Sequence, residues 1–155
     1  MGKKTGGAGE IRRGHDRSTT EAQRHRGTEK TVYYHKELTE KLIACAIEVH
    51  RHLGPGLLES AYDECFCYEL GKNGVPIERQ KALPLVYKEI KLDCGYRMDV
   101  VADNKVVVEL KCVEKILPIH EAQLLTYLKL SGLKVGLIIN FHAATLREGI
   151  KRLAL

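Results

Sequence analysis

The spacing of apolar residues predicts three helices in the chain. In residues 36–53 apolar side chains recur every three or four positions, which is the period of one helix face, and Gly54-Pro55-Gly56 ends the pattern. A second helix is predicted over residues 57–70, before two glycines, and a third over residues 118–131, which opens with a proline. Each segment has an apolar stripe that must be buried against another element.

Other segments have the composition of strands. The predicted strands are residues 77–81, 84–88, 91–102, 105–113 and 135–141. The last of them is almost wholly apolar, as in a strand buried on both faces. Residues 146–155 fit either a short helix or an edge strand. This order of elements predicts an α/β sandwich around a mixed sheet.

Composition agrees with one ordinary folded domain. The chain has 155 residues, of which 44% are hydrophobic, enough for a real core. No apolar run approaches the ~18 residues of a membrane helix, and no secretory leader is recognisable. Five cysteines without a CxxC pair indicate reduced thiols. We therefore expect a cytoplasmic protein without a membrane segment.

The positive charge is concentrated near the N-terminus. Residues 1–35 contain eight Lys/Arg against four Asp/Glu, whereas the remaining residues contain 17 against 16. Residues 1–30 have almost no large apolar side chains, so we expect them to form a disordered basic tail. Residues 36–155 are expected to form the folded domain, which is close to neutral. Its overall charge therefore gives little support for binding nucleic acid.

Candidate chemistry lies on two predicted strands that follow each other in the sequence. In the segment VVVELK, Glu109 and Lys111 point to one face of the strand. Asp99 lies on the preceding strand. It can stand directly opposite Glu109 only if residues 103–105 form a three-residue loop, or if the strand has a bulge. Asn104 or Lys105 would then take a left-handed backbone conformation.

These groups together suit phosphodiester hydrolysis. Two carboxylates can hold a hard cation such as Mg²⁺, which activates water for attack on a phosphodiester. Lys111 could assist the water or stabilise the charge of the transition state. The simpler alternative is an exposed strand face that carries a Glu–Lys pair.

Two helices add further candidate residues. Glu59 lies on the flank of the apolar stripe of the second helix, near the start of that helix. It could join the metal site, or it could only be a favourable charge at a helix N-terminus. On the third helix, Gln123 and Tyr127 are one turn apart and can reach a common ligand, or they are an ordinary polar flank.

Several separated blocks resemble a known family. Gly56-Leu57-Leu58-Glu59-Ser60-Ala61-Tyr62 matches the signature of the bacterial GxxExxY proteins, which are similar to a compact branch of the PD-(D/E)XK nuclease superfamily. The resemblance spans residues 36–155. It continues through the blocks YRMD (96–99), VELK (108–111), HEAQLLTYLK (120–129) and GLIINF (136–141).

The resemblance implies a fold and an activity. The implied fold is a PD-(D/E)XK nuclease-like three-layer sandwich, a central mixed sheet flanked by helices. The implied function is a metal-dependent nuclease, with Mg²⁺ or Mn²⁺ as cofactor and nucleic acid, DNA in the first instance, as substrate. A non-catalytic module that binds nucleic acid or a protein on the same scaffold remains the alternative.

The resemblance also assigns roles to individual residues. Asp99, Glu109 and Lys111 occupy the D…ExK positions, which hold the metal and the catalytic lysine. Glu59 occupies the helical acidic position that completes the metal shell. Gln123 and Tyr127 match the QxxxY element found beside the site, on the substrate side. We expect the carboxylates of Glu59, Asp99 and Glu109 and the amine of Lys111 to converge on one pocket.

A zinc site is a third, weaker possibility. It would use His50, His52, Cys65 and Cys67. The two histidines are two residues apart on a helix and do not share a face, and CxC is a poor tetrahedral pair. We therefore set zinc aside.

Overall fold

The computed structural model describes residues 33–155. In chain order the elements are α1 (Lys36–Leu53), α2 (Glu59–Lys72), β1 (Ile77–Ala82), β2 (Leu85–Tyr87), β3 (Ile90–Leu92), β4 (Arg97–Ala102), β5 (Val106–Lys111), α3 (Pro118–Ser131), β6 (Val135–Asn140), the 3₁₀ helix η1 (Leu146–Gly149) and β7 (Ile150–Ala154). The expected tail, residues 1–30, lies outside the described residues. Within residues 33–155, no helix has both the length and the apolar character needed to cross a membrane.

Within residues 33–155, five strands form the central sheet in the order β1-β4-β5-β6-β7. Strands β5 and β6 are parallel, and the other neighbours are antiparallel, so the sheet is mixed. The chain reaches β6 from β5 through α3, because parallel neighbours need a crossover connection. Every residue of β6 is buried, as its apolar sequence predicts for a central strand.

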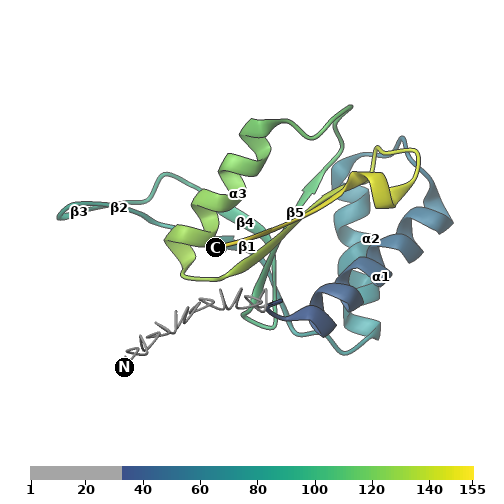
Figure 1. Cartoon of the computed structure of the whole chain (residues 1–155), viewed down its shortest axis with the longest axis horizontal. Coiled ribbons are helices and arrows are strands. Elements are labelled where there is room, and N and C mark those ends of the chain that lie inside the picture. The colour runs from purple at the N-terminus through teal and green to yellow at the C-terminus, as the bar shows by residue number, and fades with distance from the viewer. Residues whose placement is uncertain (1–32) are drawn as a thin grey trace, which may run out of the picture. The chain divides into compact units, whose positions relative to one another are not determined.

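Helices cover both faces of this sheet (Figure 1). Helices α1 and α2 pack on one face, where alternate residues Val106, Val108 and Leu110 of β5 join their core. Helix α3 packs on the other face, where Val107 joins the second core with Leu124 of α3. The alternation along β5 thus supplies both cores from one strand. The three-layer α/β sandwich with a central mixed sheet is confirmed.

The prediction of one continuous strand over residues 91–102 is wrong. Strand β3 ends at Leu92, β4 begins at Arg97, and β3 pairs with β2 in a separate two-stranded hairpin. The break has a local cause: the carboxylate of Asp93 accepts the backbone N–H of Gly95 at 3.2 Å, and Gly95 has φ of 73°. This left-handed glycine turns the chain back toward the central sheet.

Residues 146–155 contain both of the alternatives that the sequence left open. The 3₁₀ helix η1 comes first, and β7 follows directly and pairs with the edge of β6. The junction needs Gly149, because a Cβ atom there would overlap the backbone carbonyl oxygen of Asn140. A short helix and an edge strand therefore share ten residues.

Candidate active site

The hairpin between β4 and β5 has the predicted register. Val100 pairs with Val108 and Ala102 pairs with Val106, so residues 103–105 form the three-residue loop that the sequence required. Asn104 has a φ of 52°, as expected, and Asp103 rather than Lys105 is the second left-handed residue, with a φ of 48°. This register places Asp99 opposite Glu109.

Beyond the Val100–Val108 pair, the two strands are joined by hydrogen bonds between carboxylate side chains and backbone N–H groups. The backbone N–H of Asp99 donates to Oε1 of Glu109 at 3.1 Å. In return, the backbone N–H of Leu110 donates to Oδ2 of Asp99 at 2.9 Å. Each carboxylate is therefore held by the main chain of the opposite strand. Both acids are fixed in position before any ligand arrives.

Glu109 is the most perturbed acid of this region. Its side chain is buried, with 4% of its surface exposed. Burial first, and then the neighbouring charge of Asp99, raise the pKa of Glu109 to about 8, while the backbone hydrogen bond from Asp99 and the charge of Lys111 oppose the change. A carboxyl group in this environment favours its proton unless a cation replaces it.

Glu59 approaches Asp99 from the α2 side. It is the first residue of α2, and burial followed by the charge of Asp99 raises its pKa, while Lys111 lowers it. Glu59 and Asp99 line one small cavity of about 190 Å³. Glu109 and Lys111 are not among the residues that line it. The structure therefore brings Asp99 together with each of the other two acids, but the four groups do not line a single pocket.

A buried tyrosine fixes the loop that precedes Glu59. The hydroxyl of Tyr62 donates to the carbonyl oxygen of Gly54 and accepts the backbone N–H of Leu57 at 3.2 Å. Its ring stacks on Phe141, with centroids 4.6 Å apart and an interplanar angle of 6°. The first turns of α2, which begins at Glu59, are thus tied to the residue that follows β6.

Gln123 and Tyr127 interact directly on α3. The amide nitrogen of Gln123 donates to the hydroxyl of Tyr127 at 3.0 Å. Burial raises the pKa of Tyr127, and the charge of Glu109 adds to the effect, which places the phenol within the electrostatic reach of the acids. Tyr127 also meets Tyr96 edge to face, with centroids 6.4 Å apart.

Sequence reasoning missed three further polar residues that line the small cavity beside Leu110, namely Ser60, Asp63 and Gln80. Asp63 could have been noticed, because it lies one helical turn after Glu59. Ser60 follows Glu59 directly, but a serine at a helix start is too common to be informative. Nothing in the sequence singles out Gln80.

Gln80 has an unusual backbone. Its neighbours Arg79 and Lys81 pair with Val100 and Met98, so Gln80 stands beside Asp99, and its φ is 49°. Strand β4 is irregular at the same level: Met98 joins the core under α3, whereas Val100 joins the core under α1 and α2. Residues two apart on a regular strand share one face. Both irregularities, at Gln80 in β1 and between Met98 and Val100 in β4, therefore flank Asp99.

Asn140 secures the chain beyond Lys111. It is buried and pairs with Lys111 across β5 and β6. Its Oδ1 accepts the backbone N–H of Val113 at 3.1 Å, and its amide donates to the carbonyl oxygen of Val113 at 2.8 Å. A second N–H, from His142, reaches the same Oδ1 at 3.2 Å. This side chain therefore holds together the ends of two parallel strands.

The donor chemistry of the three acids fits a divalent cation. Carboxylate oxygens are the ligands that Mg²⁺ and Mn²⁺ prefer, and the hydrogen bonds of Asp99 and Glu109 engage one oxygen of each. The raised pKa of Glu109 marks a buried acid that a cation would neutralise. Across the part of the chain that the structure describes, however, no three His, Cys, Asp or Glu side chains stand together as a ready metal site.

Two of the four residues of the zinc possibility, His50 and Cys67, have other partners. A ring nitrogen of His50, Nε2, lies 2.8 Å from the carbonyl oxygen of Ala143. The thiol of Cys67 contacts Oδ1 of Asp63 at 3.5 Å, and burial raises its pKa to about 12. A thiol with such a pKa is a poor source of the thiolate that zinc needs.

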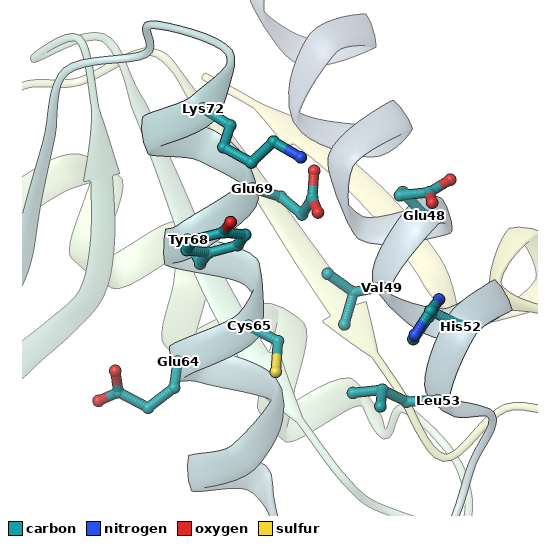
Figure 2. Close-up of a pocket in the computed structure, with 9 residues that line it drawn as sticks. All are labelled: Glu48, Val49, His52, Leu53, Glu64, Cys65, Tyr68, Glu69 and Lys72. Carbon is teal, nitrogen blue, oxygen red and sulfur yellow. The ribbon is translucent and has the colours of Figure 1, made fainter.

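A larger cavity lies between α1 and α2, away from the predicted site residues. Figure 2 shows that its side chains come from the facing sides of the two helices, among them His52, Leu53, Cys65 and Tyr68. Its volume is about 480 Å³, and none of the six predicted site residues lines it. The site argued from the sequence is thus not the most spacious hollow in the described residues.

Comparison with known families gives one result. A family model described as the PD-(D/E)XK nuclease superfamily matches residues 36–153. No curated protein and no solved structure matches the chain. The match covers all six predicted site residues and the central sheet up to residue 153 in β7.

Proposed function

Because the chain belongs to the PD-(D/E)XK nuclease superfamily, we propose that it is a metal-dependent nuclease that hydrolyses phosphodiester bonds in nucleic acid, with DNA as the first substrate to test. The observation that carries the proposal is the paired hold on Asp99 and Glu109 by the backbone of opposite strands. The signature at residues 56–62 further favours the GxxExxY branch of that superfamily.

Glu59, Asp99 and Glu109 are the proposed ligands of Mg²⁺ or Mn²⁺. When bound, such a cation neutralises charge on the scissile phosphate and lowers the pKa of water. Asp99 and Glu109 are pre-positioned by the main chain, so little ordering of these two acids is left to occur when a ligand binds. Burial of Glu109 keeps bulk water away from one side of the site.

Lys111 is the proposed electrostatic stabiliser. It lies two residues after Glu109 on β5 and is half buried, and its charge acts on both Glu59 and Glu109. An ammonium group there can donate hydrogen bonds to phosphoryl oxygens as negative charge accumulates on them. Gln123 and Tyr127, held to each other on α3, are proposed to contact the substrate beside it.

A second candidate is a binding module without turnover. It is favoured by the lack, within residues 33–155, of any group of three potential ligands arranged for a metal. The near-neutral charge of the folded part points the same way, with 17 Lys/Arg against 16 Asp/Glu in residues 36–155. Such a module would bind nucleic acid or protein and leave it intact.

One assay separates the two. Plasmid and short single-stranded and double-stranded oligonucleotides are incubated with the protein in Mg²⁺, Mn²⁺ or EDTA, beside Lys111→Ala and Asp99→Asn. We expect metal-dependent cleavage by the wild type. Lys111→Ala should lower turnover by ~10²–10³, with binding changed only a few fold, because its charge matters most in the transition state. Asp99→Asn should also weaken metal-dependent binding of the substrate.

The binding module predicts a different outcome. Wild type would then cleave no substrate in any metal, and both variants would lose ligand binding to a similar extent. That result would reject the nuclease assignment while leaving the fold unchanged.

A further inference from the structure

Arg79 joins the edge strand β1 to helix α2. Its nitrogen Nη2 donates to Oδ2 of Asp63 at 2.7 Å and to Oε1 of Glu64 at 2.8 Å. Its other terminal nitrogen, Nη1, donates to Oε2 of Glu64 at 3.3 Å. One planar guanidinium thus holds two carboxylates that are neighbours on α2. Forked contacts of this kind fix geometry as well as pairing charge.

These contacts join two walls of the small cavity that Glu59 and Asp99 line. Asp63 lines the same cavity and lies one helical turn after Glu59 on α2. On the sheet side, Gln80 follows Arg79 directly in β1 and also lines the cavity. A contact between Arg79 and Asp63 therefore links the α2 wall of the cavity to its β1 wall.

This link is the directional part of the packing of α2. Within residues 33–155, the hydrogen bonds of Arg79 are the only ones that join α2 to the central sheet. The other contacts of the helix with the sheet are apolar, through side chains such as Phe66 and Leu70 in the core. Apolar burial is non-directional, so it holds the helix on the sheet without fixing its exact place. The hydrogen bonds of Arg79 supply that restraint.

Stability alone does not explain these ion pairs. The side chain of Glu64 is 71% exposed and that of Arg79 is 36% exposed, whereas Asp63 is more buried. Exposed ion pairs add little to the free energy of folding. The effect of Arg79 is therefore expected in the placement of α2 more than in the stability of the domain.

We propose that Arg79 is a positioning residue of the candidate active site. By holding Asp63 and Glu64 against β1, it keeps the carboxylate of Glu59 at the separation from Asp99 that a shared cation requires. The role rests on the proposed function, because it takes Glu59 and Asp99 to be ligands of one cation. Arg79 itself touches neither the cation nor the substrate.

Charge alone predicts the opposite effect on cation binding. Arg79 is a cation beside a group of acids, so its removal makes their surroundings more negative and should attract Mn²⁺ or Mg²⁺ more strongly. Loss of positioning should weaken binding, because Glu59 would no longer be held at the required separation from Asp99. The sign of the change in affinity therefore separates the two effects.

A direct contact between Arg79 and a substrate phosphate is the weaker alternative. Both terminal nitrogens of Arg79 already donate to carboxylates, so a phosphate would have to displace Asp63 or Glu64. The displaced carboxylate would then face the phosphate without a counter-charge, and the two groups would repel each other.

The test measures the binding of Mn²⁺ alone. Isothermal titration calorimetry at one pH compares wild type, Arg79→Ala, Glu59→Gln and the double variant. We expect Arg79→Ala to weaken Mn²⁺ binding about tenfold, as is typical when a residue that orients a metal ligand is lost. The double variant should bind no more weakly than Glu59→Gln, because both changes act through the same carboxylate. Thermal melting of Arg79→Ala in EDTA should stay close to that of wild type.

Two further variants sharpen the comparison. Arg79→Lys keeps the charge but cannot span both carboxylates, so it should also bind Mn²⁺ more weakly than wild type. Arg51→Ala is the matched control. Arg51 donates to Glu48 at 2.6 Å, but both residues lie on α1. This substitution removes the same charge and an ion pair with a glutamate, and it should leave Mn²⁺ binding unchanged.

Several outcomes would overturn the positioning role. Arg79→Ala could bind Mn²⁺ as tightly as wild type or more tightly, its loss could add to that of Glu59→Gln, or Arg51→Ala could weaken binding equally. Wild-type affinity in Arg79→Lys would show that charge is sufficient. A large fall in the melting temperature of both Arg79 variants would make the loss one of folding. Weaker oligonucleotide binding by Arg79→Ala in EDTA would make Arg79 a phosphate contact.

The proposed function fails separately. Wild type that binds Mn²⁺ through Glu59 and Arg79 but cleaves no nucleic acid keeps the positioning role and rejects the nuclease. Cleavage by wild type, with Mn²⁺ affinity insensitive to Arg79→Ala, does the reverse. Wild type that binds no Mn²⁺ rejects both.

Discussion

Asp99 and Glu109 hold each other's strands, since each carboxylate accepts a hydrogen bond from the main chain on the other side of the β4–β5 hairpin. The two acids thereby replace a rung of the ladder that ends at Val100 and Val108. Burial, and then the repulsion between the two charges, raise the pKa of Glu109. Stability and charge are therefore coupled at this point of the sheet.

The first prediction concerns pH. The pKa of Glu109 is about 8 in the folded chain, against 4.5 for an unperturbed glutamate, so between these values the folded state holds a proton that the unfolded state has released. Stability should fall as pH rises through this window, by at most about 1.4 kcal/mol per pH unit. Glu109→Gln keeps the acceptor oxygen and removes this slope. Denaturant unfolding in EDTA from pH 5 to pH 9 measures both proteins.

Glu59 titrates in both proteins, so the comparison between wild type and Glu109→Gln isolates residue 109. The variant should be the more stable protein at pH 8, with the difference shrinking toward pH 5. Parallel stability curves across the whole range would show that Glu109 is already ionised in the metal-free chain.

The second prediction concerns metal binding. At pH 7 the metal-free site retains a proton on Glu109, because its pKa is about 8, and a cation must displace it. Mg²⁺ binding should therefore release about one proton and tighten as pH rises. Calorimetric titration in two buffers with different ionisation enthalpies should give different heats. Glu109→Gln should bind more weakly and show no such difference, whereas equal heats for wild type would contradict the proposed ligand.

The relative placement of Asp99 and Glu109 could be predicted from the sequence, because side chains alternate regularly along a strand. The alternation of VVVELK placed Glu109 and Lys111 on one face, and it required a loop of residues 103–105, or a bulge, if Asp99 was to stand opposite Glu109. The observed register has that loop. Glu59 was proposed from its place on a predicted helix and Lys111 from the alternation of its strand, the family resemblance assigned a role to each, and their charges do act on the paired acids. Their roles remain predictions.

What the sequence did not reveal depends on backbone distortion and on separate sheets. Gln80 lines the cavity and has a left-handed backbone conformation in the middle of a strand. Glutamine rarely adopts this conformation, so the sequence does not predict it. The sequence also did not predict the separate β2–β3 hairpin, because its end depends on a local turn. Leu92 and Arg97 both suit strands, and only the turn at Asp93 and Gly95 shows that they belong to different sheets.

The third prediction follows from the backbone of Gln80. Gln80→Gly removes an amide from the cavity and suits a φ of 49°, so stability should stay within about 1 kcal/mol of wild type. Cleavage should nevertheless fall about tenfold, the effect of ~1.4 kcal/mol of lost stabilisation in the transition state. Gln80→Asn, which tolerates this conformation and keeps the amide, should retain more activity than Gln80→Gly.

Asn104→Gly is the control for Gln80→Gly. Asn104 has a similar φ of 52° but lies in the β4–β5 loop, at the other end of both strands from the acids. Its replacement should leave cleavage unchanged. An equal loss of activity in both variants would mean that backbone freedom, and not the Gln80 amide, is responsible.

The fourth prediction tests the junction of η1 and β7. Gly149→Ala places a methyl group against the carbonyl oxygen of Asn140 and the side chain of Ala143, so it should cost about 1–3 kcal/mol of stability. Gly71→Ala lies in α2 with open space around its Cβ position and should instead stabilise by about 0.5–1 kcal/mol. Urea unfolding of both variants measures the difference. A neutral Gly149→Ala would show that the turn after Asn140 is wider than described.

The stack of Tyr62 on Phe141 has a consequence for genetics. Glu59 depends on a loop that the Tyr62 hydroxyl holds, and that ring is supported by Phe141 from the far end of β6. A random mutagenesis screen for inactive clones should therefore recover changes at both aromatic positions beside changes at the acids. Double mutants of Phe141 and Glu59 should be no worse than either single mutant, since both lesions remove the same carboxylate from its place.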